Sequence, residues 1–114
     1  MDYTNQLMAN LFKAVAHPTR IRILRLLEPG PLCVCEILPQ VDSEQSNTSQ
    51  HLSVLKQSGV LTSRREGTRV IYSVADPAIY SLLHLAQGLV LRQIREASRR
   101  LSPEEEGADV RVDQ

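Results

Sequence analysis

Hydrophobic positions in the first part of the chain recur at helical spacing. Residues 4–16 carry apolar side chains three and four positions apart, which predicts an amphipathic helix. His17-Pro18 then predicts the start of a second helix, because proline suits the first helical position. The run Glu28-Pro29-Gly30-Pro31 ends that helix. The pattern therefore predicts two successive helices before residue 28.

Two shorter helical segments follow. Residues 32–38 predict a short helix that Pro39 should curtail, and residues 41–45 predict a turn. Residues 46–58 predict a helix that is polar along its first half and stops at Gly59. A short helix, a turn and a helix with a polar leading end are typical of a helix-turn-helix.

From residue 61 onward, the helical spacing of apolar residues gives way to the alternating pattern of β-strands. Residues 61–66 and 69–74 predict two strands, and Gly67-Thr68 predicts the hairpin turn between them. Val70, Tyr72 and Val74 alternate onto one face of the second strand. The expected fold class is mostly α with a two-stranded β-wing, a winged helix-turn-helix.

The last helix should begin at Asp76-Pro77 and run to about Arg100. Between Ile79 and Ile94 it is apolar on most sides, and one small domain can cover only one of them. We therefore expect a homodimer formed through the N- and C-terminal helices. Its predicted interface residues are Leu7, Leu11, Leu82, Leu85, Leu89 and Ile94.

Charge divides the chain unevenly. The net charge is zero, with 13 Lys and Arg against 13 Asp and Glu. Residues 101–114 hold five acids and one base, which leaves 12 bases against 8 acids in residues 1–100. A basic body is compatible with a polyanionic partner. We expect one winged helix-turn-helix and dimerisation domain over residues 1–100 and an acidic flexible tail over residues 101–114.

The sequence also narrows the location and class of the protein. The longest uncharged stretch, residues 77–91, is too short and too interrupted to span a bilayer, and nothing at the start is typical of a signal peptide. We expect a cytoplasmic protein without a membrane partner. The chain has no glycine-rich phosphate loop, acid pair or Cys-x-x-Cys, so we do not expect an enzyme. A winged-helix module that binds other proteins remains an alternative class.

Four local strings, in order, resemble the ArsR/SmtB family of metal-responsive repressors. They are His17-Pro18-Thr19-Arg20-Ile21-Arg22-Ile23-Leu24, Leu32-Cys33-Val34-Cys35-Glu36-Ile37, Ser49-Gln50-His51-Leu52-Ser53-Val54-Leu55-Lys56-Gln57-Ser58-Gly59 and Arg65-Glu66-Gly67-Thr68-Arg69-Val70-Ile71-Tyr72. The resemblance covers roughly residues 7–95. At Cys33 and Cys35 the chain resembles the branch that senses arsenite and antimonite, whose Cys-Val-Cys string also occurs, with added ligands, in cadmium and lead sensors. It implies a small dimeric repressor that leaves its operator when a toxic ion binds.

The polar helix and the wing predict a DNA-binding surface. Short polar side chains at the leading end of a helix can reach base edges in the major groove, and wing arginines can contact phosphates. The resemblance places His51 on the DNA-facing side. The predicted DNA-binding residues are Ser46, Asn47, Ser49, Gln50, His51, Ser53, Lys56, Arg64, Arg65, Thr68 and Arg69. A dimer would present two such helices, so the partner should be double-stranded operator DNA with an imperfect inverted repeat.

Cys33 and Cys35 are the predicted metal ligands. Thiolates select soft ions, but residues two apart on an ideal helix point about 200° apart. The pair can hold one ion only if the first turn is extended or unwound. Ligation would then distort the helix that precedes the recognition helix. A direct disulfide between the two would close a small strained ring, so we expect oxidation to involve a partner thiol.

The resemblance suggests trivalent arsenic or antimony as the inducer. Arsenite sensors of the family often carry a third cysteine where this chain has Leu38. The cadmium–lead type adds cysteines near the N-terminus, and residues 1–16 contain no Cys or His. Ala78 and Leu89 occupy places where the zinc type has ligands. Control by thiol redox state or by another soft metal, such as cadmium or lead, remains open, as does a structural role for two buried cysteines.

Overall fold

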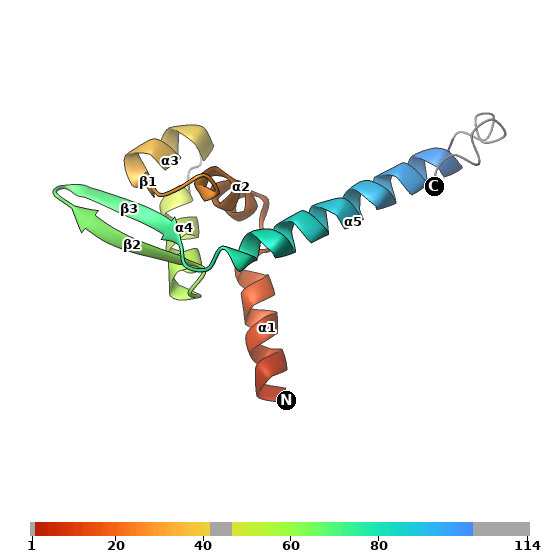
Figure 1. Ribbon diagram of the computed structural model, residues 1–114, viewed down its shortest axis with the longest axis horizontal. Coiled ribbons are helices and arrows are strands. Elements are labelled where there is room, and N and C mark those ends of the chain that lie inside the picture. The colour runs from red at the N-terminus through yellow and green to blue at the C-terminus, as the bar shows by residue number, and fades with distance from the viewer. Residues whose placement is uncertain (1, 42–46, 102–114) are drawn as a thin grey trace. The chain divides into compact units, whose positions relative to one another are not determined.

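The computed structural model describes residues 2–41 and 47–101, which fall into two compact units that divide after Pro77. The second unit contributes a single described helix, α5 (Ala78–Arg100). The elements of the first unit are, in order, α1 (Asp2–Val15), α2 (Pro18–Leu27), β1 (Leu32–Cys33), α3 (Val34–Val41), α4 (Thr48–Gln57), β2 (Leu61–Glu66) and β3 (Arg69–Val74) (Figure 1). This order confirms the predicted fold class, with helices and a β-wing.

The helix ends follow the expected local chemistry. His17 caps α2, because its side chain accepts a hydrogen bond from the backbone N–H of Thr19, and Pro18 follows at the first helical position. At the end of α4, Gly59 takes φ +86°, the left-handed conformation that glycine adopts without steric cost. The N–H of Gly59 then bonds to Lys56 O and that of Val60 to Leu55 O, which closes a Schellman motif.

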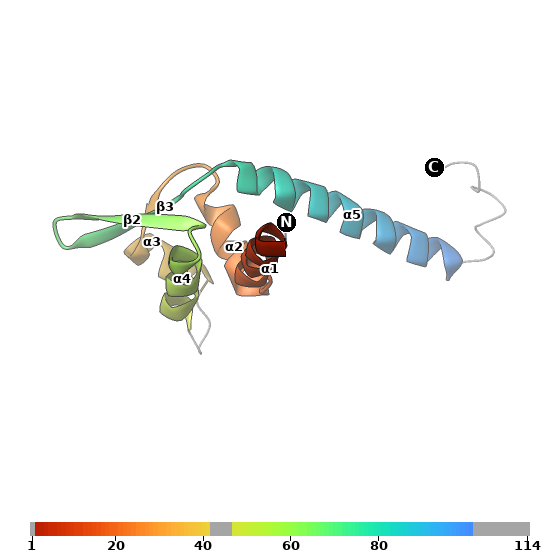
Figure 2. The same ribbon diagram turned by 90° about the horizontal axis from the view of Figure 1, so that it is seen from below.

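The sheet has three antiparallel strands in the order β1–β3–β2. β2 and β3 form the predicted hairpin around Gly67, with Leu61 opposite Val74 and Glu66 opposite Arg69. The hairpin projects away from the helices of its own unit in both Figure 1 and Figure 2. The third strand, β1, was not predicted, and it pairs with the other edge of β3.

The segment around Cys33 differs from the prediction. Residues 32 and 33 are strand rather than helix, so the expected helix over 32–38 begins two residues later. Pro39 lies inside α3 and does not curtail it, since the helix continues to Val41. Proline has no backbone N–H and so removes one hydrogen bond from a helix. Pro39 is only two residues from the end of α3, so the loss affects just the last turn.

The core of the first unit lies between α2, α3, α4 and the start of the hairpin. α2 packs against both α3 and α4, and α4 also contacts β2 and α1. Ile23, Leu24, Ile37, Leu52 and Leu55 are almost fully buried. Because Leu52 and Leu55 face inward, the opposite side of α4 is left for solvent. Thr48 is buried as well, so the exposed side of α4 begins with Asn47 and Ser49.

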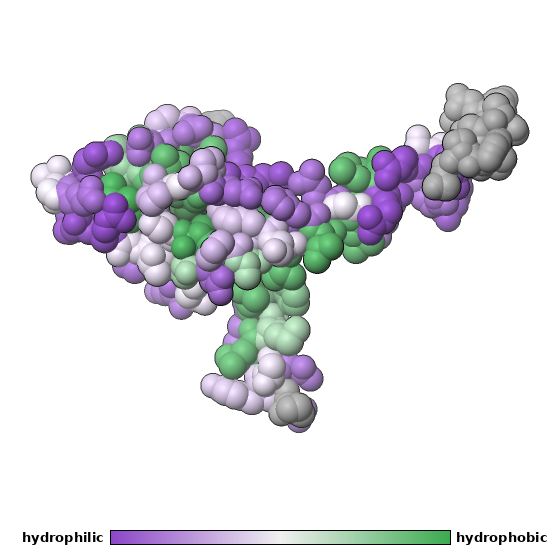
Figure 3. Space-filling view, in the orientation of Figure 1, coloured by the Kyte–Doolittle hydropathy of each residue, from purple (hydrophilic) through white to green (hydrophobic). Residues whose placement is uncertain are grey.

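Two helices expose apolar side chains, each in its own unit. Leu7, Met8 and Phe12 are about half exposed on α1, and Leu85 and Ile94 are 73% and 57% exposed on α5. Figure 3 shows hydrophobic side chains at the surface along both helices. Among the described residues, no helix is long and apolar enough to cross a membrane.

Candidate functional site

The exposed side of α4 carries most of the predicted DNA-binding residues. Asn47 precedes the helix as its N-cap residue and makes no side-chain capping bond there, so its amide is not used by the helix end. Ser49, Gln50, Ser53 and Lys56 are all exposed on α4. Ser46 lies outside the described residues. The structure therefore gathers short polar side chains and one lysine on the face of α4 opposite its buried leucines.

The wing carries the basic part of the candidate surface. Arg64 and Arg65 lie on β2, Thr68 lies in the turn and Arg69 begins β3, and all four are exposed. Arg64 is paired with Glu66 at 2.8 Å, whereas Arg65 has no ion-pair partner within the described ranges. Both arginine side chains stand on a hairpin that projects from the helices, where they can reach a polyanion.

His51 has a different environment from the other predicted residues of α4. It is half-buried, and its ring lies 4.3 Å, centroid to centroid, from the ring of His17. Its Nδ1 accepts a hydrogen bond of 3.0 Å from Arg20 Nε. Burial, together with the electrostatic influence of His17 and Arg20, lowers the pKa of His51 below its ordinary value. The structure thus adds a contact between α4 and α2 that the sequence pattern did not reveal.

The two cysteines meet at the junction of β1 and α3. Cys33 is the last residue of β1 and is buried, while Cys35 lies in the first turn of α3 and is exposed. Their Cα atoms are 5.0 Å apart and the structure joins their sulfur atoms in a disulfide. The expectation that the two would not bond directly was wrong, because Cys33 is extended and its side chain does not follow helical geometry. The two sulfurs meet across a strand-to-helix junction, and not within a helical turn.

Cys33 also caps α3. Its Sγ accepts a hydrogen bond from the N–H of Cys35 at 2.9 Å, and its own N–H donates to Oε1 of Glu36 at 2.8 Å. These bonds resemble a capping box, because the side chain three residues after the cap accepts from the cap N–H, although the cap sulfur accepts from the second residue of the helix and not from the third. The Cys-x-x-Glu spacing is a sequence signal for this motif that the pattern of hydrophobic positions does not carry.

Glu36 connects the cysteine pair to the wing. The same Oε1 atom lies 3.8 Å from Arg69 Nη2, and both side chains are about half exposed. A solvent-exposed ion pair of this length contributes little to stability, so its significance is geometric. Cys33 also lies opposite Ile71 of β3, because β1 pairs with the edge of the wing. The sulfur site, the start of α3 and the wing are thus one connected structure.

The described chain offers no further protein ligands around the two sulfurs. No group of three or more His, Cys, Asp or Glu side chains that could hold a metal ion occurs within residues 2–41 and 47–101. A site here would therefore use two protein thiolates. This arrangement fits a soft ion that completes its coordination with hydroxide or a small thiol.

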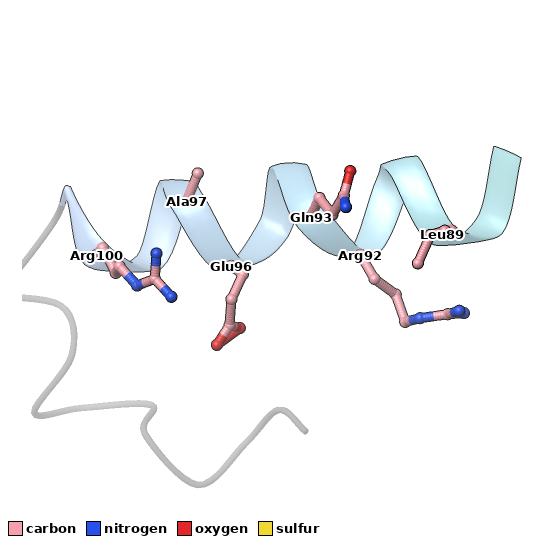
Figure 4. Close-up of a pocket in the computed structure, with 6 residues that line it drawn as sticks. All are labelled: Leu89, Arg92, Gln93, Glu96, Ala97 and Arg100. Carbon is pink, nitrogen blue, oxygen red and sulfur yellow. The ribbon is translucent and has the colours of Figure 1, made fainter. Parts of the chain in front are cut away.

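A hollow on α5 has no feature of an active site. It is lined by Leu89, Arg92, Gln93, Glu96, Ala97 and Arg100, all from this one helix (Figure 4). A small-molecule site normally encloses most of its ligand, which a hollow with a single helical wall does not do.

Comparison with known proteins agrees with this geometry. Residues 17–63 match the model of the family described as bacterial regulatory protein, arsR family. The chain is 45% identical over 92 residues to the uncharacterized HTH-type transcriptional regulator Rv0081 of Mycobacterium tuberculosis, and the match covers 80% of this chain and 81% of that protein. The chain belongs to the arsR family. Members of the ArsR/SmtB family are transcriptional regulators rather than enzymes, and so is this chain.

Solved structures of similar proteins share the fold. The crystal structure of M. tuberculosis Rv0081 superposes with a TM-score of 0.74 at 43% identity, covering 83% of this chain and 96% of that one. The solution structure of Mb0332 from Mycobacterium bovis, described as a homodimeric winged helix-turn-helix DNA-binding domain, superposes with a TM-score of 0.72 at 29% identity, covering 83% and 88%.

Other relatives are named for resistance to soft metals. The arsenical resistance operon repressor of Escherichia coli is 42% identical over 66 residues, which is 57% of this chain and 56% of that protein. The cadmium resistance regulatory protein CadC homolog of Staphylococcus aureus is 36% identical over 80 residues, or 69% of this chain and 66% of that one. The names of these two relatives refer to different ions, arsenic in one case and cadmium in the other.

Proposed function

We propose that this ArsR-family regulator is a homodimeric repressor that binds operator DNA through α4 and the wing and releases it when a soft ion binds Cys33 and Cys35. The observation that carries the proposal is the position of the cysteine pair. It lies at the start of the helix-turn-helix, where Cys33 is hydrogen-bonded to α3 and lies opposite Ile71 of the wing in the sheet.

DNA binding is supported by the two parts of the exposed surface. The polar side chains of α4, including Asn47, Gln50 and Ser53, suit base edges, and amide side chains pair well with adenine. Arg64, Arg65 and Arg69 of the wing suit phosphates, which contribute affinity without sequence preference. The surface therefore has the two kinds of contact that a sequence-specific duplex binder needs.

Dimerisation is supported by the uncovered apolar side chains of α1 and α5. Leu7, Leu82, Leu85, Leu89 and Ile94 are between 39% and 73% exposed in the single chain. Their burial against a second copy would be favourable by about 25 cal/mol for each Å² of apolar surface. Mb0332, which shares the fold, is described as homodimeric. A dimer presents two α4 helices, and its operator should be an imperfect inverted repeat.

The proposed inducer is trivalent arsenic or antimony. With both cysteines reduced, arsenous acid would form two As–S bonds and release two water molecules, keeping one hydroxide as its third ligand. The adjacent sulfur positions of Cys33 and Cys35 fit this two-point attachment. The E. coli relative named for arsenical resistance supports this choice of ion.

Release follows from the capping role of Cys33. An ion on both sulfurs competes with the hydrogen bond that Cys33 Sγ accepts from the Cys35 N–H. It also constrains the Cys33 backbone, which pairs with β3. α3 and the wing would then shift relative to α4, which would disrupt the DNA-binding surface that α4 and the wing form together.

A second candidate is control by thiol oxidation. The disulfide between Cys33 and Cys35 is the specific observation that favours it. A peroxide would accept two electrons from the two thiols, forming the S–S bond and two water molecules. Cadmium and lead are further soft-metal candidates, and the S. aureus relative is named for cadmium resistance.

The test is fluorescence anisotropy of the reduced protein on its own promoter fragment and on a scrambled duplex of equal length. We expect binding to the promoter to be tighter by at least about 10³-fold. Equal affinities for the two duplexes would contradict sequence-specific repression. Arsenite, antimonite, cadmium and hydrogen peroxide, added separately to the promoter complex, then distinguish the inducers. Release by peroxide that dithiothreitol reverses, without release by arsenite, would select the redox candidate.

A further inference from the structure

A cluster formed by the side chains of His17, Arg20 and His51 joins α4 to α1 and α2. Arg20 of α2 donates from Nε to Nδ1 of His51 on α4, and from Nη1 to the carbonyl oxygen of Ala14 near the end of α1, both at 3.0 Å. The Ala14 carbonyl belongs to the last turn of a helix, where carbonyls lack helical partners. One guanidinium therefore links α1, α2 and α4.

Both histidines of the cluster act as acceptors. His17 Nδ1 accepts from the Thr19 N–H, and His51 Nδ1 accepts from Arg20. An imidazole accepts only when it is neutral, because both nitrogens of the protonated ring are donors. Protonation of His51 would break its hydrogen bond with Arg20 and would place a new positive charge beside the His17 ring, 4.3 Å away.

The neighbouring elements do not favour that protonation. α2 contributes His17 and the permanently charged Arg20. α1 contributes Lys13, which lines a hollow together with Arg20 and Val54. β2, which also contacts α4, carries Arg64, Arg65 and Glu66 in its second half, and Glu66 is paired with Arg64. α4 itself carries Lys56 and no acidic residue.

We propose that Arg20 is a positioning residue for DNA recognition, which holds α4 against α1 and α2 through neutral His51, so that protonation of His51 loosens α4 and weakens operator binding. This inference rests on the proposed function, since it takes α4 to be the helix that reads DNA. It adds a proton as a regulator at a place separate from the cysteine pair.

The expected sign is opposite to that of simple electrostatics. Acidification makes a protein more positive and ordinarily strengthens its attraction to phosphates. If His51 served as a cationic phosphate contact, operator affinity would rise on acidification. If the cluster acts as we propose, operator affinity falls on acidification. The fall is up to about tenfold per pH unit for each proton that the protein takes up when it leaves the DNA.

The experiment is a series of anisotropy titrations of the reduced protein on its promoter fragment from pH 8.0 to 5.5 at constant salt. Wild type should lose affinity on acidification. In His17→Asn the asparagine still caps α2, so affinity at pH 8.0 should stay within about twofold while the acid loss becomes shallower. Arg20→Ala should bind more weakly at pH 8.0 and lose most of its pH dependence. The matched control Arg22→Ala, on the same helix but bonded to Gln40 O of α3, should keep the wild-type profile.

The outcomes separate the two proposals. A wild-type affinity that is flat or rises on acidification overturns the inference, and so does an unchanged profile in His17→Asn. No preference for the promoter at pH 8.0 overturns the proposed function instead. Circular dichroism checks the folding of Arg20→Ala, and if that variant does not fold, the His17→Asn profile decides.

Discussion

Cys33 lies directly opposite Ile71 in the pairing of β1 with β3, so the cysteine that begins the helix-turn-helix is also part of the sheet that includes the wing. Its sulfur accepts a hydrogen bond from the first turn of α3, and its N–H donates to Glu36. We therefore expect a chemical change at this sulfur to affect both α3, which precedes α4 in the chain, and the wing, which follows it.

The double variant Cys33→Ser, Cys35→Ser should keep operator binding and lose the response to arsenite. Serine can still cap α3 through its hydroxyl, but it is not a ligand for a soft ion. The measurement is anisotropy on the promoter fragment with and without arsenite. The single variant Cys35→Ser, which retains the capping sulfur, should also lose the response because one thiolate cannot chelate. An unchanged response in the double variant would place the sensor site elsewhere.

Glu36→Ala should destabilise the start of α3. It removes the acceptor of the Cys33 N–H, and loss of a capping partner costs about 0.5–2 kcal/mol. Glu36→Gln is the matched control, because glutamine also accepts in a capping box. Urea unfolding measures both free energies. Equal stabilities of the two variants would show that the hydrogen bond to Cys33 does not stabilise the helix start.

Arg65→Ala should weaken binding to all duplexes alike. Arg65 is exposed on the wing and has no ion-pair partner in the described part of the chain, so its guanidinium is available for a phosphate. The slope of log affinity against log salt should become shallower by about 0.9 for each phosphate that the variant no longer neutralises. Arg95→Ala on α5 is the control and should leave the slope unchanged. An unchanged slope in Arg65→Ala would rule out a phosphate-binding role for this side chain.

Leu85→Glu should produce a monomer that binds the operator poorly. Leu85 is 73% exposed, so the folded chain should tolerate a charge there, but a dimer interface would not. Light scattering after size exclusion measures the mass, and anisotropy measures the affinity. Glu96→Gln, a polar change on the same helix, should remain dimeric. If Leu85→Glu is still a dimer, this part of α5 does not belong to the dimer interface.

Stability should fall as the pH drops below about 6.5, the ordinary pKa of histidine. Burial, His17 and Arg20 lower the pKa of His51 in the folded protein, so the unfolded chain binds the proton more readily. The stability from neutral His51 is then fully present above the unfolded-state pKa and is lost as the pH falls toward the folded-state pKa. Urea unfolding at pH 7.5 and 5.5 measures the difference, which should be smaller in His17→Asn. A wild type that is no less stable at pH 5.5 would contradict this account.

Local signals predicted much of the fold from the sequence. The hairpin bounds agree with the structure because alternation and Gly67 act over a few neighbouring residues. The end of α4 at Gly59 and the start of α2 at Pro18 were predictable for the same reason. β1 was not, because a strand of two residues has no periodicity and exists through its pairing with Tyr72 and Ile71 far along the chain.

The candidate site was predicted in its residues but not in its connections. The sequence identified Cys33 and Cys35, yet their direct bond depends on a strand-to-helix junction that helical periodicity does not show. The bond from Arg20 to His51 joins residues 31 positions apart, and no local pattern specifies it. Glu36 could have been found, since it occupies the third position after a capping residue.

The central claim is that the cysteine pair controls DNA binding. The most direct measurement is an arsenite titration of the reduced protein bound to its labelled promoter fragment, followed by fluorescence anisotropy. The account predicts release at roughly one ion per Cys33–Cys35 pair, and hence about two per dimer. Tight binding that persists through excess arsenite would contradict it.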